Sequence, residues 1–313
     1  MRIVVIANPA SSRGGGLKGR QRLVDALDRA VSAETDCSYS IVETTTRGVA
    51  VRTGKFVEGS GAALAHQAAL EGADVVAAAG GDGTVGEVAN GLIGTETAMA
   101  VLPMGTGNDF ARTLGIGTDL DLAARTLVSG DCQLIDVGRV VHGGNFVNVA
   151  GCGFDAEVAA RINHGFRRLR GTSAYIAAVL QTLVSFHPAA IELEVDGVRH
   201  NAKVMLCAIA NAKTYGGGMR IAPGAQLDDG LFDLVLVGDA SKTEFLRAFP
   251  SVFKGTHITH PKVTIFRAKS IAIRSASPLP TLADGEEIGT TPVEFEIVPK
   301  ALTVMVPRKS SIG

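Results

Sequence analysis

The segment of the sequence best suited to phosphate chemistry is glycine-rich and contains one aspartate, with the letters GGDGT at residues 80–84. An apolar run at 73–79 before it predicts a buried strand, and residues 85–92 after it predict a helix. A strand, a glycine turn and a helix bring backbone N–H groups and a helix N-terminus to a phosphate. Asp82 would repel that phosphate unless a divalent cation lay between them. The alternative is a plain strand-to-helix turn in which Asp82 caps the helix.

Two further loops repeat this arrangement. An apolar strand at 98–102 ends at Pro103, and the sequence PMGTGNDFAR at 103–112 then supplies two glycines, a threonine, an Asn-Asp pair and a helix start. Strand 3–7 runs into Asn-Pro and a run of glycines, which indicates another phosphate-approaching loop or a flexible turn. Loops on neighbouring parallel strands meet at the carboxyl edge of the sheet, where open α/β sheets bind ligands.

Two patterns of elements would position these loops. Up to Asp136, short apolar strands alternate with helices, which predicts a doubly wound parallel sheet with right-handed crossovers. After Asp136, alternating strands with hairpin signals such as Asp196-Gly197 predict a mostly antiparallel β-sandwich. We therefore expect an α/β domain at 1–136 and a β-rich domain at 137–298. Helices are predicted at residues 17–31, 62–70, 85–92 and 121–129, with two more inserted into the second domain at 155–163 and 172–186.

Composition excludes several classes of protein. The chain has 313 residues and a formal net charge of −1, so no overall positive field favours nucleic acid. The apolar part of the N-terminal segment is about five residues long, below the 7–15 of a signal peptide. No apolar run reaches membrane-spanning length, and the four cysteines show no metal or redox spacing. We expect a cytoplasmic protein that meets membranes only at their surface.

The two glycine motifs together resemble a known family. GGDGTVGEVANGL followed by PMGTGNDFAR is similar to the soluble bacterial diacylglycerol kinases, which share a catalytic domain with sphingosine and ceramide kinases. NAD kinases carry GGDGT and phosphofructokinases a similar loop, whereas the second motif is more specific. The resemblance implies transfer of the γ-phosphoryl group of ATP to a lipid hydroxyl, with diacylglycerol as the leading acceptor. Relatives return their last strand to the first domain, so residues 299–313 are expected to complete it.

The resemblance also assigns roles to residues. Glu286 matches the proposed general base, Asp284 matches a further active-site carboxylate, and Asp82 would act on Mg²⁺ that accompanies ATP. Thr44 matches a threonine near the nucleotide, but Thr45 and Thr46 stay open because residues 51–61 resemble an insertion. The expected ATP contacts come from the three glycine loops and their surroundings: Asn8, Pro9, Ser11, Ser12, Thr44, Gly80, Gly81, Asp82, Gly83, Thr84, Glu87, Gly105, Thr106, Asn108 and Asp109.

Two further segments gain meaning from the resemblance. Relatives hold a structural magnesium at positions that match the carbonyl oxygens of Gln226 and Leu231 and the carboxylate of Asp229; the residues alone predict a β-turn. Residues 161–171 contain four arginines and either dock on an anionic membrane or remain solvated. The apolar helix at 175–184 that follows them either packs in the core or walls a cleft for acyl chains.

Two other functions stay open from the sequence. An NAD kinase would share GGDGT, although PMGTGNDFAR argues against it. A non-catalytic lipid-binding or regulatory protein would keep the fold and lose the chemistry, against which the carboxylates Asp82, Asp284 and Glu286 argue. Exposed strands at the edge of the second domain would permit a homodimer.

Overall fold

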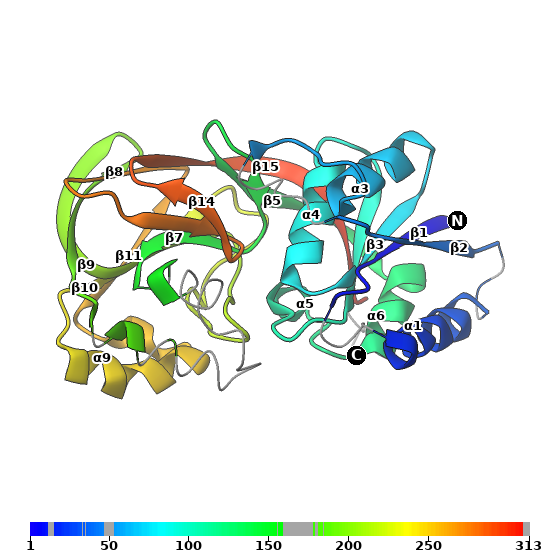
Figure 1. Ribbon diagram of the computed structural model, residues 1–313, viewed down its shortest axis with the longest axis horizontal. Helices are drawn as coiled ribbons and strands as arrows, with labels where there is room; N and C mark the ends of the chain where they lie inside the picture. Colours follow the sequence, from blue (N-terminus) through cyan, green and yellow to red (C-terminus); the bar gives the residue numbers. More distant parts are fainter. Residues whose placement is uncertain are drawn as a thin grey trace.

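In the computed structural model, the described residues are 1–11, 16–32, 34, 36–46, 53–154, 156–158, 178, 181–183 and 185–308. Ser12, the arginine-rich segment 161–171 and most of the two predicted inserted helices lie outside them. The chain forms two halves that lie side by side, an α/β half and a β-rich half (Figure 1).

The α/β half is a twisted parallel sheet between two helix layers. Its strand order is β2-β1-β3-β4-β15, and every strand pair in it is parallel. One layer contains the contacting helices α1 and α6, and the other contains α3 and α4 (Figure 1). The elements are β1 (Arg2–Ala7), α1 (Gly16–Val31), β2 (Ser38–Glu43), α3 (Gly61–Leu70), β3 (Val75–Gly80), α4 (Asp82–Leu92), β4 (Ala98–Pro103), α5 (Asp109–Thr113) and α6 (Leu120–Ser129).

Local sequence explains why these elements form. β3 (VVAAAG) is buried at all six positions, as a parallel strand covered by helices on both faces must be. Ser60 caps α3 with its side-chain oxygen, and Asp119 caps α6 in the same way. A Cβ on Gly91 would lie 2.3 Å from the carbonyl oxygen of Ala62, so glycine lets α4 pack closely against α3. The C-terminal end of α4 is thereby held against α3.

The β-rich half is a mostly antiparallel structure that extends the same sheet. The path continues from β15 through β12, β8, β9, β7 and β13 to β14, with β10 and β11 added beside β9. The strands are β5 (Asp131–Val140), β6 (Asn145–Phe146), β7 (Val149–Gly153), β8 (Ala189–Val195), β9 (Val198–Ala210), β10 (Phe232–Gly238), β11 (Val263–Ala268), β12 (Ser270–Ser275), β13 (Pro280–Ala283), β14 (Glu286–Thr290) and β15 (Val293–Val306). Helix α9 (Lys242–Ala248) and the 3₁₀ helices η1 (Phe249–Phe253) and η2 (Thr256–Thr259) lie between β10 and β11.

The last strand joins the two halves. The segments 293–298 and 302–306 both belong to β15, which pairs with β5 on either side of a register shift between Val298 and Leu302. Val304 pairs with Met99 of β4, so the C-terminal part of β15 returns to the α/β half as expected. β5 and β15 therefore form a continuous bridge between the halves (Figure 1).

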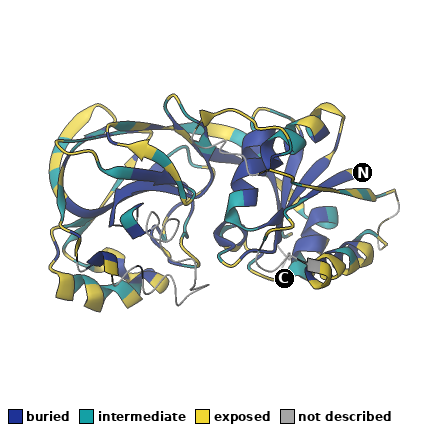
Figure 2. Ribbon diagram, viewed as in Figure 1, coloured by how far each residue is buried: buried dark blue, intermediate teal, exposed yellow. Residues whose placement is uncertain are grey.

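Each half has its own hydrophobic core (Figure 2). In the β-rich half, Phe146 stacks on Phe232 at a centroid distance of 5.8 Å and meets Phe295 edge-on at 5.9 Å. All three rings are fully buried, and such aromatic pairs stabilise a core beyond their buried area. Among the described residues, no helix is long and apolar enough to cross a membrane.

Candidate active site

The glycine loops predicted from the sequence come together at the carboxyl edge of the parallel sheet. Asn8 follows β1 and donates a hydrogen bond from Nδ2 to Oγ1 of Thr84, on the first turn of α4, at 3.1 Å. Asn8 Oδ1 accepts the N–H of Ala10 at 2.9 Å, which turns the chain into the next loop. Ser11 Oγ is a buried oxygen with no hydrogen-bond partner among the residues that the structure describes. A phosphate oxygen or a water molecule at this loop would satisfy it.

The second glycine loop packs directly on the first. A Cβ on Gly105 would lie 2.3 Å from Cα of Gly81, so the two backbones can approach only because both residues are glycine. Asn108 lies in the left-handed region (φ 52°) and closes its own loop, because its Oδ1 accepts the N–H of Gly105 and its Nδ2 donates to the carbonyl of Gly105. Asn108 therefore shapes the loop through its side-chain amide.

Asp82 links the two loops. Asp82 is the first residue of α4, and its Oδ1 accepts the N–H of Asp109 at 2.7 Å. This hydrogen bond satisfies a free backbone N–H at the N-terminus of α5. A Cβ on residue 107 would lie 2.6 Å from Asp82 Oδ2 and would block this edge of the carboxylate. The edge is accessible because residue 107 is glycine. Burial raises the pKa of Asp82 above its ordinary value, against several backbone hydrogen bonds that lower it. A nearby positive charge would relieve this penalty.

Asp109 connects the α/β half to the β-rich half. Its two carboxylate oxygens accept the N–H groups of Gly217 and Gly218, each at 2.7 Å. Asp109 is 4% exposed, and burial together with the neighbouring Asp82 raises its pKa to about 6. The glycine run 216–218 has positive φ at all three positions, a conformation that other residues adopt only with strain.

Asp284 contributes a third carboxylate from the turn between β13 and β14. Its side chain accepts the N–H groups of Val147, Asn148 and Val149, at 2.8, 2.8 and 3.2 Å. Enclosure of the carboxyl group raises the pKa of Asp284 to about 7 despite these three donors, and Asp82 raises it further. A Cβ on Gly86 would lie 3.7 Å from Asp284 Oδ2, so this turn lies against the first half of α4. Three carboxylates from both halves thus face a common region.

The remaining predicted residues are placed around this centre. Glu286 begins β14, two residues after Asp284, and is half-buried. Glu87 lies inside α4, where its Oε2 accepts the N–H of Gly61 at the start of α3. Thr106 is exposed at the tip of the second glycine loop. The contact of Glu87 therefore orients α4 relative to α3. Glu286 follows directly after the turn that the hydrogen bonds of Asp284 fix.

A hollow of about 260 Å³ opens beside the first loop. It is lined by residues from β1, α1, β2, β3 and the start of the second loop, including Asn8, Pro9, Leu23, Ile41 and Met104. The N–H of Thr44 donates to the carbonyl of Ala7 at 2.9 Å, which places Thr44 beside the end of β1. Thr45 and Thr46 instead donate their N–H groups to Gly59. Of the three threonines, Thr44 is therefore the one tied to the strand end that borders the hollow.

The cation site expected at residues 226–231 does not have the arrangement that a cation needs. Asp229 Oδ1 accepts the N–H of Leu231 at 3.1 Å, and Oδ2 forms an ion pair with Arg267 of β11. Each carboxylate oxygen accepts one protein donor, and the negative charge is balanced by a guanidinium group. Gln226 precedes this turn. As they stand, these residues do not fit a cation held by Asp229.

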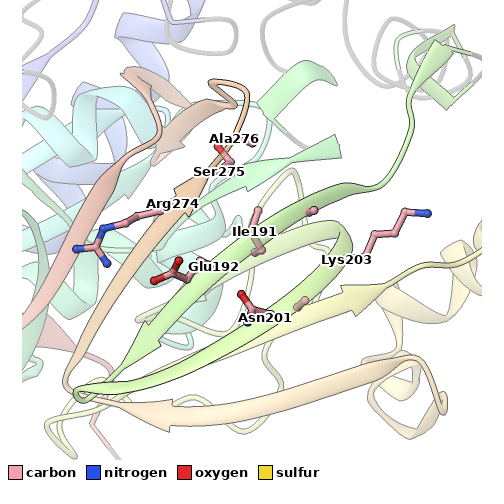
Figure 3. A pocket seen from close by; sticks show the side chains of 9 residues that line it. Ile191, Glu192, Asn201, Lys203, Arg274, Ser275 and Ala276 are labelled. Atoms are coloured by element: carbon pink, nitrogen blue, oxygen red, sulfur yellow. The ribbon is translucent and has the colours of Figure 1, made fainter.

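A broad hollow of about 560 Å³ lies elsewhere, on the sheet surface formed by β8, β9 and β12 (Figure 3). Glu192, Asn201, Lys203 and Arg274 line it, and the close-up shows these side chains spread over an open sheet face. None of the residues predicted for the site is among its lining residues. Its size alone does not make it the reaction centre.

Two sets of site contacts escaped the sequence analysis. The loop from Tyr215 to Met219 supplies the N–H groups that Asp109 binds, and its signal in the sequence is three consecutive glycines after a long strand. Asn90 of α4 exchanges hydrogen bonds with the backbone of Asn145 at 2.8 and 2.9 Å. Both sets join residues far apart in sequence, so pattern alone could not pair them.

Comparisons with known proteins identify the family of the chain. Residues 2–140 match the family model described as the diacylglycerol kinase catalytic domain, and residues 148–306 match the YegS C-terminal NAD kinase beta sandwich-like domain. The chain is 34% identical over 250 residues to the diacylglycerol kinase of Bacillus subtilis (strain 168), covering 79% of this chain and 82% of that protein. It is 36% identical over 251 residues to the diacylglycerol kinase of Mycobacterium tuberculosis (strain H37Rv), covering 78% and 81%.

Solved structures show the same fold. A crystal structure of a diacylglycerol kinase from Bacillus anthracis str. Sterne superposes with a TM-score of 0.69 at 20% identity and covers 100% of this chain and 98% of that chain. A second crystal structure from that strain gives a TM-score of 0.74 at 23% identity over 97% of both chains. The sequence matches cover both halves of the molecule, including the loops that carry the three carboxylates. The chain therefore belongs to the diacylglycerol kinase family and is a lipid kinase of that type.

Proposed function

We propose that the protein transfers the γ-phosphoryl group of ATP to the free hydroxyl of diacylglycerol and produces phosphatidic acid. The observation that carries this proposal is the contact of Asp109 with the loop 215–219. On one side of that loop Gly217 and Gly218 bind a carboxylate of the phosphate-binding loops, and on the other side Tyr215 and Met219 line an apolar cavity. A phosphate-binding region and an apolar site are thus separated by a single short loop.

The apolar cavity has the chemical lining, though not yet the volume, of a site for the chains of a lipid acceptor. Its volume is about 70 Å³, and its walls come from β9, β10, α9, η1 and the 215–219 loop. Leu206, Met219, Phe245 and Phe249 contribute to them, with Glu244, His257, His260 and Lys262 among the other lining residues. Ligand sites of this kind are mostly apolar with a few polar groups that fix orientation. The diacylglycerol kinases named above support the assignment of the acceptor.

We further propose a division of labour between the halves. Residues 1–136, completed by 299–313, would bind ATP, and residues 137–298 would bind the lipid. The hollow beside Asn8, Pro9 and Thr44 would receive the nucleoside, and Gly80–Thr84 with Thr106 would present N–H groups to the phosphates, while Gly105 lets the second loop pack closely on the first. Ser11 has a buried hydroxyl in need of a partner at this position.

A divalent cation, for which Mg²⁺ is the natural choice with ATP, would fit beside Asp82. Its carboxylate is half-buried, its Oδ2 faces the space that a Cβ on Gly107 would fill, and Asp109 and Asp284 add negative charge nearby. Such a cation would neutralise phosphate charge as the transferred group moves. The carboxylates on their own would repel ATP, so a bound cation is needed between them and the phosphates.

Glu286 would accept or orient the proton of the lipid hydroxyl. Asp284 would act as a positioning residue, because its three hydrogen bonds to the 147–149 backbone fix the turn from which Glu286 projects. Asp109 would hold the 215–219 loop against the phosphate-binding loops, so that acceptor and ATP meet in one orientation. Phosphoryl transfer asks mainly for such positioning and for charge neutralisation.

The direct test is phosphoryl transfer from γ-labelled ATP to a panel of lipids in mixed micelles with Mg²⁺. The panel contains diacylglycerol, phosphatidylglycerol, ceramide, sphingosine and undecaprenol, with NAD as a soluble acceptor. Label in phosphatidic acid supports the proposal. Label in another lipid would reassign the acceptor, and label in NAD alone would overturn the lipid assignment.

A further inference from the structure

The helical segment between β10 and β11 covers the apolar cavity with one of its faces. Phe245, Ala248, Phe249 and Val252 line the cavity, and their spacing of three, one and three residues places them on one side of the α9–η1 helix. α9 contains no buried residue, although a helix packed on a core normally has several. The opposite face of this segment is therefore exposed, as the ribbon of α9 in Figure 2 shows.

That outer face displays large apolar side chains. Leu246 is 42% exposed, Phe253 is 48% exposed and Ile258 of η2 is 36% exposed. Leu246, Pro250 and Phe253 recur at spacings of four and three, which aligns them along one side of the helical segment. Phe253 contacts Phe249 edge-on at 6.1 Å, so the apolar surface is continuous with the ring that lines the cavity. Gathered apolar groups on a surface mark a site of interaction.

The same face is basic. From Ala240 to Lys262 the chain has four lysines and arginines, Lys242, Arg247, Lys254 and Lys262, and one acid, Glu244. This gives a formal charge of +3 for the segment, in a chain whose total is −1. Lys262 and Glu244 neutralise each other at 2.8 Å, and no ion pair between described residues involves Arg247 or Lys254. The charge that remains on the outer face is positive and complements an anionic surface.

Apolar side chains flanked by Lys and Arg are typical of helices that lie in a membrane interface. A protein partner would be expected to meet a surface poorer in lysine, because lysine is depleted at protein interfaces. An anionic bilayer satisfies both features at once, since its headgroups attract the basic residues and its acyl region accepts Leu246 and Phe253. The cavity under the same helices would then lie on the side of the molecule that faces the lipid.

We propose that the outer face of α9, η1 and η2 docks on an anionic lipid bilayer and that the acceptor enters the apolar cavity from that side. The inference rests on the proposed function, because it assigns the entry side for a lipid acceptor. Phe253 and Leu246 insert into the interface, while Arg247 and Lys254 bind the headgroups.

The test is sedimentation of the full chain with vesicles of phosphatidylcholine alone or mixed with phosphatidylglycerol. Wild type should bind the mixed vesicles, and Leu246→Ser/Phe253→Ser should bind at least about tenfold more weakly. Arg247→Glu/Lys254→Glu should weaken binding to the mixed vesicles only. Leu17→Ser and Leu70→Ser are matched controls, because these leucines are 90% and 70% exposed on helices of the other half. Both controls should bind as wild type does.

A second measurement separates this inference from the proposed function. Activity toward a short-chain, water-soluble diacylglycerol needs no bilayer, so the docking variants should keep it within about twofold and should melt at the wild-type temperature. If the variants bind mixed vesicles as tightly as wild type does, the docking surface is wrong even where lipid is phosphorylated. If vesicle binding is lost in the variants but no lipid is phosphorylated by wild type, the surface stands and the proposed function fails. Equal loss of binding in the controls would also overturn the inference.

Discussion

Replacement of Asp109 by asparagine should slow phosphoryl transfer without weakening ATP binding. The carboxylate accepts two hydrogen bonds from Gly217 and Gly218, each at 2.7 Å, and both join the halves. Asparagine keeps one acceptor oxygen and turns an NH₂ group toward the other donor. A hydrogen bond to a charged group contributes about 1.5–3 kcal/mol, and a lost bond of this kind leaves one N–H unsatisfied. At about 1.4 kcal/mol per tenfold, kcat should fall about ten- to hundredfold.

The Michaelis constant for ATP should fall or stay unchanged. Asp109 lies beside Asp82 near the expected phosphates, so the loss of its charge removes repulsion. Initial rates at varied ATP and fixed diacylglycerol separate the two effects. Asp119→Asn is the matched control, because Asp119 also accepts two backbone N–H groups, at 3.0 and 3.1 Å, but at the remote start of α6. An unchanged kcat in Asp109→Asn, or an equal loss in the control, would refute the reasoning.

Three further outcomes are expected. The pKa values of Asp109 (about 6) and Asp284 (about 7) are raised from 3.8, so at intermediate pH the folded protein holds protons that the unfolded chain has released. The free energy of unfolding without ligands should therefore fall as the pH rises from about 4 to about 7, by at most about 1.4 kcal/mol per pH unit for each proton, in urea titrations. A flat profile would contradict these pKa shifts. Gly107→Ala should reduce activity about tenfold or more, because its Cβ would lie 2.6 Å from the Asp82 carboxylate. Gly224→Ala has open space around its Cβ and should keep the wild-type activity. Equal rates in the two variants would refute the steric account. Without ATP, melting of wild type should respond to chelator no more than it does to salt, whereas Arg267→Met should gain stabilisation by Mg²⁺ at the carboxylate it frees. A large chelator effect on wild type that Asp229→Asn abolishes would show that a cation is held there after all.

Much of the fold could be predicted from local pattern. The apolar runs at 73–79 and 98–102 are short and bounded by glycine or proline, and they form β3 and β4 almost as expected. Asp196-Gly197 is the turn between β8 and β9, and Asp284-Gly285 is the turn between β13 and β14. The change from alternating helices and strands to strands with hairpins follows from periods of 3.6 and 2 residues, which are local properties of the chain.

Contacts between distant segments could not be predicted in the same way. The sequence suggests that Asp82 faces phosphate, but its pairing with the N-terminus of α5 depends on how two loops stack. The three donors to Asp284 lie at residues 147–149, more than a hundred positions away. Arg267 reaches Asp229 because β10 and β11 pair, and that charge pair alters what a turn expected to bind a cation can do. Register and loop packing determine these contacts, and neither is encoded in a short motif.

The central claim is that Glu286 serves the transfer of phosphate from ATP to diacylglycerol. Glu286→Gln and Glu287→Gln change adjacent glutamates of β14 by the same chemistry, and Glu287 is the more exposed of the two. Labelled ATP, diacylglycerol micelles and Mg²⁺ give the rate of phosphatidic acid formation for each variant. The account predicts that Glu286→Gln lowers the rate roughly 10²–10⁴-fold, while Glu287→Gln leaves it within about twofold of wild type. Phosphatidic acid formed at the wild-type rate by Glu286→Gln would contradict it.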